Sequence, residues 1–342
     1  MLACFVSASA CGGGPSVGPN DPVGGFLSHL SGPLPETIGE LGLYPDPARR
    51  DQVHPNAHRY VPAQPLWSSG SQKERFIVLP PEQAVDTSDG QAWSFPLGTL
   101  LLKTFTYPDA EPPFGERAIE TRVLRREADG FEYAVYLWSD DGTSAELIDL
   151  SRSRAVPVAI EGEAFEHVVP ARLDCRKCHE SQEVAVLGFD ELGLNAPLDA
   201  DGEDGGESTQ LEAFLEAGLL SHAPAGPAAR ITHDDPTTNQ VLEYLEGNCT
   251  HCHNGGDRAS AAFDLRYPVA LANLIDQQTQ GDALSGVRVV SGQPEQSALW
   301  LAFSRADIDG IQPMPPVGVD RVDQAALALF ESWIASLPPS VD

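Results

Sequence analysis

The sequence has few basic residues: 21 Lys and Arg stand against 50 Asp and Glu, which gives the 342-residue chain a formal charge of −29. Nucleic acids and anionic lipid surfaces are bound through basic faces, so this balance argues against both as electrostatic partners. No apolar run reaches the ~18 residues that suggest a membrane-spanning helix. We therefore expect no nucleic-acid partner. A docking partner should have a basic face, and its binding should weaken with salt.

Several chemistries have no recognisable signature in the sequence. It contains no phosphate-binding loop, no Ser/His/Asp arrangement, no paired-carboxylate motif and no repeat of fixed period beyond the two motifs described below. Methionine occurs only at positions 1 and 314. Glycine (31 residues) and proline (29 residues) are frequent, so we expect many turns and irregular segments rather than a helical bundle.

Two of the six cysteines, Cys4 and Cys11, lie in a short stretch of apolar and small residues at the start of the chain. The segment Ala8-Ser9-Ala10-Cys11 resembles the cleavage box of bacterial lipoproteins, with Ala8 where Leu is usual. We expect residues 1–22 to be a signal-like segment and a flexible tether. This places the protein in the periplasm or on the outer membrane of a Gram-negative bacterium, with a lipid on Cys11 as its only membrane contact.

The other four cysteines form two Cys-x-x-Cys-His motifs, which is the attachment signature of c-type haem. The two thiols of each motif can add to the two vinyl groups of one haem, and the histidine that follows can bind the iron as proximal ligand. We predict two covalently bound haem c groups, with His179 and His253 as iron ligands. The residues predicted to hold them are Cys175, Cys178, His179, Cys249, Cys252 and His253.

Two other uses of these cysteines are weaker. A structural zinc site with four thiolates is one alternative, but residues 179–248 separate the inner cysteines, far more than the ~15–20 residues of a compact zinc ribbon. Zinc also gives no reason for a histidine directly after each pair. Disulfides within each pair would close very small loops and contribute little stability.

Met314 is the predicted sixth ligand of the second haem. It lies in Pro313-Met314-Pro315-Pro316, where the prolines stiffen a loop that can hold a thioether at the iron. Asp235-Pro236 predicts the start of a helix before the motif, and apolar spacing predicts further helices over 297–303 and 323–336. This order resembles a class I cytochrome c. We expect His251, inside the motif, to be a solvent-facing spacer.

The sixth ligand of the first haem is left open by the sequence, because no methionine lies near His179. The candidates are His222, His167 and, at lower odds, His54 and His58; an open or water-bound iron is a further option. The choice matters, because an open iron can bind peroxide or small gases whereas a six-coordinate iron mainly passes electrons.

The region from about residue 60 to 160 is predicted to be β-rich, and its role is not indicated by the sequence. Asp129-Gly130 is a plausible hairpin turn between two of its strands. The acidic, glycine-rich run at 199–207 is interpreted as a solvated loop, with calcium binding as the alternative. The strand candidates are 74–79, 97–107, 119–126, 131–138 and 155–160.

Over residues 40–338 the chain resembles an uncharacterised family of exported bacterial di-haem c-type cytochromes. The resemblance implies haem binding and electron transfer and supplies no substrate. The chain departs from the family in its acidic insertion at 199–207 and in its weak signal segment. The matching segments are Pro65–Gly70, Trp93–Thr99, Lys103–Phe105, Glu120–Arg122, Val169-Pro170, Asn248–Asn254, Met314–Pro316 and Trp333–Leu337.

Together these observations predict an α+β multidomain protein that transfers single electrons in the bacterial cell envelope, with a basic redox partner. The alternative function is a di-haem peroxidase, or a haem-bearing oxidoreductase subunit, with an open first haem. The predicted organisation is a signal-like segment and tether (1–22), a β-rich domain (23–160) and two mainly α-helical cytochrome c-like haem modules (161–235 and 236–342).

Overall fold

A computed structural model describes most of the chain. It covers residues 28–90, 92–108, 115–160, 162–198, 208–257, 262–279, 286–308 and 310–339. The predicted signal-like segment and tether and the acidic run at 199–207 lie outside these residues. Among the helices in the described ranges, none has the length and hydropathy needed to cross a membrane.

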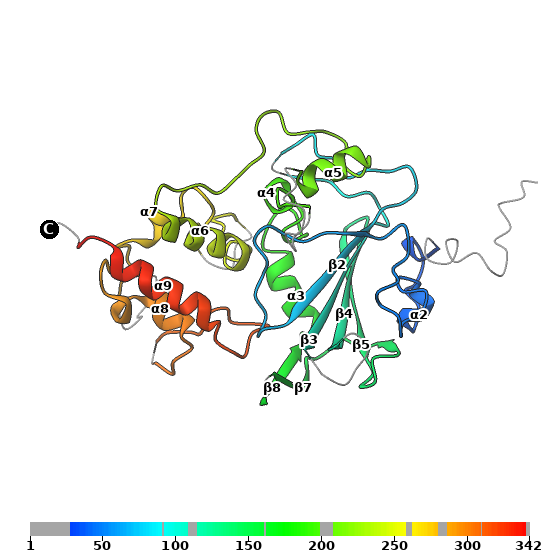
Figure 1. Ribbon diagram of the computed structural model, residues 1–342, viewed down its shortest axis with the longest axis horizontal. Coiled ribbons are helices and arrows are strands. Elements are labelled where there is room, and N and C mark those ends of the chain that lie inside the picture. The colour runs from blue at the N-terminus through cyan, green and yellow to red at the C-terminus, as the bar shows by residue number, and fades with distance from the viewer. Residues whose placement is uncertain are drawn as a thin grey trace, which may run out of the picture.

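The centre of the molecule is an antiparallel sheet of six strands in the order β1-β2-β3-β4-β5-β6 (Figure 1). Each strand pairs with the strand next to it in sequence. A hairpin joins β4 to β5 with Glu127 opposite Gly130, which confirms the predicted turn at Asp129-Gly130. The strands are β1 (His58–Arg59), β2 (Gln72–Val78), β3 (Leu100–Pro108), β4 (Glu116–Glu127), β5 (Gly130–Trp138) and β6 (Ala145–Leu147).

Both faces of the sheet are covered, because successive side chains of a strand point to opposite sides. One face packs against the N-terminal segment, which contains the 3-10 helix η1 (Ser28–Leu30) and helix α2 (Ile38–Leu41). The other, which we call the motif face, carries Ile77, Leu101, Leu124 and Tyr133 and packs against Cys175 and the segments that follow it.

A second, two-stranded sheet leads from the first sheet to the first cysteine motif. It consists of β7 (Arg154–Ile160) and β8 (Glu163–Val169). Val158 of β7 packs on Tyr107 and Ile119 of the large sheet. The chain then passes Pro170 and enters α3 (Arg172–His179), which ends at the histidine of the first motif.

The predicted fold class is wrong in its two mainly α-helical haem modules. In the described part of residues 161–235, which is 162–198 and 208–235, the chain forms β8 and three helices of at most eight residues: α3, α4 (Glu191–Leu194) and α5 (Gln210–Glu216). Their apolar side chains, such as Phe189 and Phe214, join the core on the motif face instead of forming a helical core of their own. The molecule is therefore a β-rich chain with short helices arranged around one large sheet.

The C-terminal part contains the longest helices, α6 (Pro236–Asn248) and α9 (Gln324–Ser336), which pack on each other. The Asp235 side chain accepts a hydrogen bond from the Thr238 amide at 2.7 Å, and Pro236 opens α6 as predicted. These helices lie beside the sheet with α3 between them and it (Figure 1). The shorter elements here are α7 (Ala270–Leu274), η3 (Pro294–Gln296) and α8 (Ala298–Phe303).

Candidate functional site

The first motif is fixed to the motif face of the large sheet. The Arg172 side chain at the start of α3 donates a hydrogen bond to the backbone oxygen of Tyr133 in β5 at 3.0 Å. Cys175 and Cys178 are separated by about one helical turn and are both partly buried. The two thiols therefore stand on one short, anchored helix, as attachment of both to one haem requires.

His179 has an orientation suited to binding a metal through Nε2. Its Nδ1 lies 2.6 Å from the backbone oxygen of Ala185, so Nδ1 carries the proton and Nε2 keeps its lone pair. Burial, with the positive charges of Lys103 and Arg122, lowers the pKa of His179 to about 3. The imidazole is therefore neutral at ordinary pH, the form that ligates iron.

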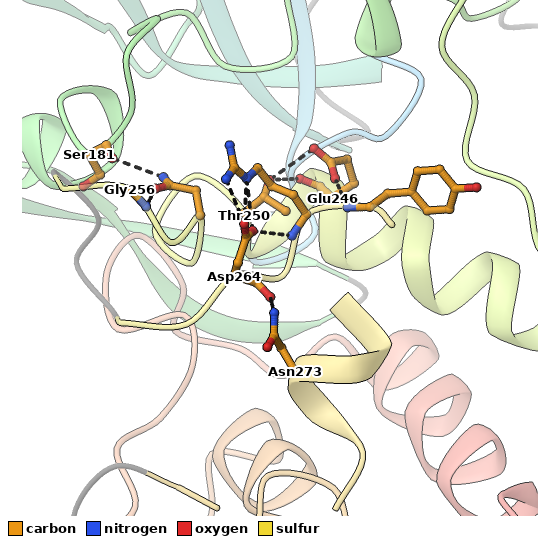
Figure 2. A network of polar contacts seen from close by, with 9 residues as sticks. Ser181, Glu246, Thr250, Gly256, Asp264 and Asn273 are labelled. Carbon is orange, nitrogen blue, oxygen red and sulfur yellow. Dashed lines mark hydrogen bonds and ion pairs between the residues drawn. The ribbon is translucent and has the colours of Figure 1, made fainter. Parts of the chain in front are cut away.

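The second motif forms a turn directly after α6. The amides of Cys252 and His253 both donate to the backbone oxygen of Cys249, at 3.1 and 2.9 Å. A network of polar contacts braces this turn (Figure 2). In it the Thr250 hydroxyl donates to the backbone oxygen of Glu246 at 2.7 Å, and the Asn273 amide donates to the backbone oxygen of Asp264 at 2.9 Å.

His253 lies against the ring of Phe263, with ring centroids 4.5 Å apart. Its Nδ1 is buried and has no hydrogen-bond partner among the described residues. Burial is the main cause that lowers the pKa of His253, so this imidazole is also neutral at ordinary pH. A buried imidazole nitrogen without a protein partner is costly unless another ligand satisfies it.

Met314 is held near the second motif by α8 and the residues after it. Its amide donates to the backbone oxygen of Ala302 at 3.0 Å. The Arg305 side chain donates to the backbone oxygen of Pro315 at 2.9 Å. The loop is thus tied on both sides of Met314, which limits the freedom that its side chain would lose on binding a metal.

All seven residues predicted from the sequence line one cavity of about 610 Å³. This volume lies within the ~300–1,000 Å³ typical of cofactor and ligand sites. Much of the remaining wall is apolar and comes from both the motif face and the C-terminal helices, with Leu66, Leu124, Leu299 and Phe303 as examples. The donors, two thiols and one imidazole in each motif, are of the kind that holds haem c.

The two motifs meet at their second cysteines. Donor atoms of Cys178, Cys252 and His251 all lie within 4.8 Å of one another. Cys175 instead packs against the core on the motif face, and Cys249 packs in the core between α6 and α9. The four thiols therefore do not converge on one point, which argues against the four-thiolate zinc site considered from the sequence.

Two cations line the same cavity beside the first motif. Lys103 of β3 stands opposite Arg122 of β4 in the strand register, and Arg75 of β2 stands opposite Lys103 on the other side. Burial, together with Arg122 and Arg75, lowers the pKa of Lys103 to about 7. Arg122 is paired with buried Glu120 at 2.5 Å, whereas the Lys103 ammonium has no ion pair within the described ranges.

The histidines proposed as sixth ligands of the first haem do not line this cavity. His222 is exposed and hydrogen-bonded to Ser221 at 2.7 Å, and His167 is buried between Tyr107 and Glu120. His54 and His58 also lie away from it. His251, predicted to face solvent, is instead 8% exposed and lines the cavity, so that expectation is wrong.

Sequence reasoning therefore missed several side chains in the cavity wall, among them Lys103, Arg122 and His251. Lys103 and Arg122 lie in segments that matched the family resemblance, but nothing in the pattern gave them a role. Strand pairing alone reveals that they are neighbours. No protein-family model matches this chain, and no curated protein or solved structure is detectably similar to it.

Proposed function

We propose that the protein is a di-haem c-type cytochrome that transfers single electrons. One haem would be held by Cys175, Cys178 and His179, and the other by Cys249, Cys252 and His253 with Met314 as sixth ligand. The observation that carries this proposal is the convergence of all seven residues on one cavity of about 610 Å³.

When bound, each haem supplies an iron that cycles between Fe(II) and Fe(III). The protein chain holds and orients these groups and sets their surroundings. Its four thiols hold the groups covalently, and the bond from His179 to Ala185 fixes the ligating nitrogen of the first motif. The apolar wall limits water, and Lys103 and Arg122 add positive charge beside the first motif.

The proposed setting is the periplasm or the outer membrane of a Gram-negative bacterium. Support comes from the lipoprotein-like segment that ends at Cys11. The formal charge of −29 bears on the partner instead. That charge suits a redox partner with a basic docking face. A lipid on Cys11 would be the contact with the membrane.

The test is haem stoichiometry in protein made together with a cytochrome c maturation system. A pyridine haemochrome assay and an intact-mass spectrum should report two haem c groups per chain. Cys175→Ser/Cys178→Ser and Cys249→Ser/Cys252→Ser should each lose one group, and His222→Ala, a surface control, should lose none. Wild-type protein with no added porphyrin mass would overturn the proposal.

The Met314 assignment has a separate test. Met314→Ala should abolish the long-wavelength thioether-to-iron absorption band and lower the potential of one haem, because a thioether favours Fe(II). Covalent haem content should stay at two, since Met314 takes no part in attachment. A band that survives the substitution would refute ligation by Met314.

A peroxidase is the second candidate, favoured by the absence of the proposed histidines from the cavity wall beside His179. Such an enzyme requires a first haem with an open or displaceable sixth position. Stopped-flow mixing of reduced protein with hydrogen peroxide discriminates between the two functions. Rapid, saturable turnover supports the enzyme, and slow bleaching alone supports the electron carrier.

The cluster of Cys178, Cys252 and His251 favours one further reading, a zinc site with two thiolates and one imidazole. It leaves Cys175 and Cys249 unused and does not account for the fixed orientation of His179. Metal analysis in the stoichiometry experiment decides the matter: one zinc per chain without Soret absorption would establish it in place of haem.

A further inference from the structure

The segments that carry the two motifs are joined by a buried hydrogen bond. The Nδ2 of Asn254, directly after the second motif, donates to the backbone oxygen of Ser181, just after the first, at 3.1 Å (Figure 2). Both residues are buried, Asn254 at 6% and Ser181 at 5% exposure. The Asn254 Oδ1 in turn accepts from the Gly256 amide at 3.1 Å, so the side chain is held at both ends.

A second contact lies beside the first. The Cys252 thiol is 3.9 Å from the backbone oxygen of Lys177 inside the first motif. A third contact joins the motifs directly, because the thiols of Cys178 and Cys252 are hydrogen-bonded to each other. Haem attachment would convert the thiols of Cys178 and Cys252 to thioethers, which have no proton to donate, whereas the bond from Asn254 to Ser181 does not involve a thiol and would remain.

The sulfur atoms of Cys178 and Cys252 are within 4.8 Å of each other. Each sulfur is one bond away from any haem that it carries. Haems attached at these two sulfurs would therefore have their points of attachment close together. This conclusion follows from the covalent attachment alone and does not depend on how either haem is tilted.

We propose that Asn254 is a positioning residue that holds the two motifs edge to edge, so that haems on Cys178 and Cys252 exchange electrons directly. The inference rests on the proposed function and deepens it. The exchange is balanced within the pair: one iron goes from Fe(II) to Fe(III), the other from Fe(III) to Fe(II). No bond forms or breaks, and no further reactant is needed.

Two charges at such close range also influence each other. Oxidation of one iron adds a positive charge beside the other, and the interaction of charges grows as their separation falls. Reduction of the second haem should therefore be easier when the first is oxidised. We expect the electron affinity of one haem to change about tenfold with the state of the other, which is ~59 mV for a one-electron couple.

The experiment compares wild type with Asn254→Asp and Asn273→Asp in spectroelectrochemical titrations. The two Cys-to-Ser double variants provide reference spectra for each haem. Asn254→Asp replaces the amide donor with a second acceptor facing the Ser181 oxygen. Asn273→Asp makes the same change at a side-chain amide that donates to the backbone oxygen of Asp264, after the second motif. This hydrogen bond does not join the two motifs.

The wild type and Asn273→Asp should show the tenfold interaction, and Asn254→Asp should lose most of it while keeping two haems by mass. An unchanged interaction in folded Asn254→Asp would overturn the positioning role. Two attached haems that titrate independently in wild type would overturn direct contact, while leaving the proposed function intact. A chain without haem would instead overturn the proposed function itself.

If Asn254→Asp yields no folded protein, low-temperature EPR on the wild type decides the spacing. Two ferric haems in edge contact should give signals broadened or split by each other, and each single-haem variant should give an unsplit signal. Identical line shapes in wild type and in the sum of the single-haem variants would contradict the proposal.

Discussion

At the scale of single residues, Glu120 is a fully buried carboxylate that holds a charged network behind the cavity. It accepts from Arg122 at 2.5 Å and lies 2.7 Å from the His167 Nε2, whose Nδ1 lies 2.9 Å from the Tyr107 hydroxyl. Burial alone would raise the pKa of Glu120, but Arg122 and His167 outweigh it and lower the pKa to about 2.

This network predicts a defined acid sensitivity. Because the folded pKa of Glu120 lies below its ordinary value of 4.5, its stabilising effect is complete above pH 4.5 and is lost as the pH falls toward about 2. The loss amounts to about 3 kcal/mol. Denaturant titrations from pH 7 to 2 should show it.

Glu120→Gln should be less stable at pH 7, because it leaves Arg122 buried without its partner, and its stability should vary less below pH 4.5. Glu146→Gln, at an exposed position of β6, should behave like wild type. If the free energy of unfolding of Glu120→Gln fell with pH as steeply as that of the wild type, the acid sensitivity would come from other groups.

The charge of Lys103 should affect the redox potential of the haem at the first motif. Its ammonium lines the cavity beside the first motif, and a nearby positive charge favours Fe(II) over Fe(III). At pH 6, below the Lys103 pKa of about 7, most of these side chains carry a charge. Lys103→Met should then lower the potential of one haem by ~59 mV, which is a tenfold change in its Fe(II)-to-Fe(III) ratio. Lys177→Met, inside the motif but 57% exposed at its side chain, should shift it far less. Equal potential shifts in Lys103→Met and Lys177→Met at pH 6 would contradict the idea that burial strengthens the effect of the Lys103 charge.

At the scale of elements, the C-terminal end of α6 is seated against the segment before β2. The Trp67 amide donates to the Asn248 side chain at 2.7 Å. A Cβ on Gly247 would stand 2.5 Å from the backbone oxygen of Gln64, too close for any side chain. The contact lies at the last two residues of α6, directly before Cys249 of the second motif.

Gly247→Ala is consequently a test in which two effects have opposite signs. Helix propensity alone favours Ala by ~1 kcal/mol. The clash with Gln64 should outweigh it and destabilise the protein by ~1–3 kcal/mol in denaturant unfolding. Gly39→Ala in α2, where a Cβ would meet Pro47 at an ordinary 3.4 Å, should be neutral or stabilising. If Gly247→Ala were more stable than the wild type, the close approach of α6 to the Gln64 backbone would not be required.

At the scale of the whole molecule, the dominant property is the formal charge of −29. It should steer a basic partner toward the protein and repel an acidic one. We expect the rate of electron exchange with a basic cytochrome to fall steeply as the ionic strength rises from ~0.01 M to ~0.15 M. Exchange with hexacyanoferrate, an anion, should instead speed up with salt. If the exchange rates with both reagents were independent of ionic strength, electrostatic steering would be excluded.

The fold could be predicted in its local parts. Alternation of apolar residues located the main strands, Asp129-Gly130 located a hairpin, and Asp235-Pro236 located the start of α6. The first predicted helical module, residues 161–235, was wrong because its apolar residues, such as Phe189 and Phe214, do not form a helical core of their own. Only the packing shows that they bury themselves on the large sheet.

The sequence by itself determined the cysteine and histidine motifs, because the reach of two thiols and an imidazole along one turn is a local property of five residues. It could also single out Met314, one of two methionines in the chain. The tertiary structure alone decided that both motifs and Met314 share a cavity, that Cys178 and Cys252 meet, and that Lys103 and Arg122 lie beside them. The physical reason is that strand pairing and helix packing join residues far apart in the chain, and no local pattern records which distant partner each will find.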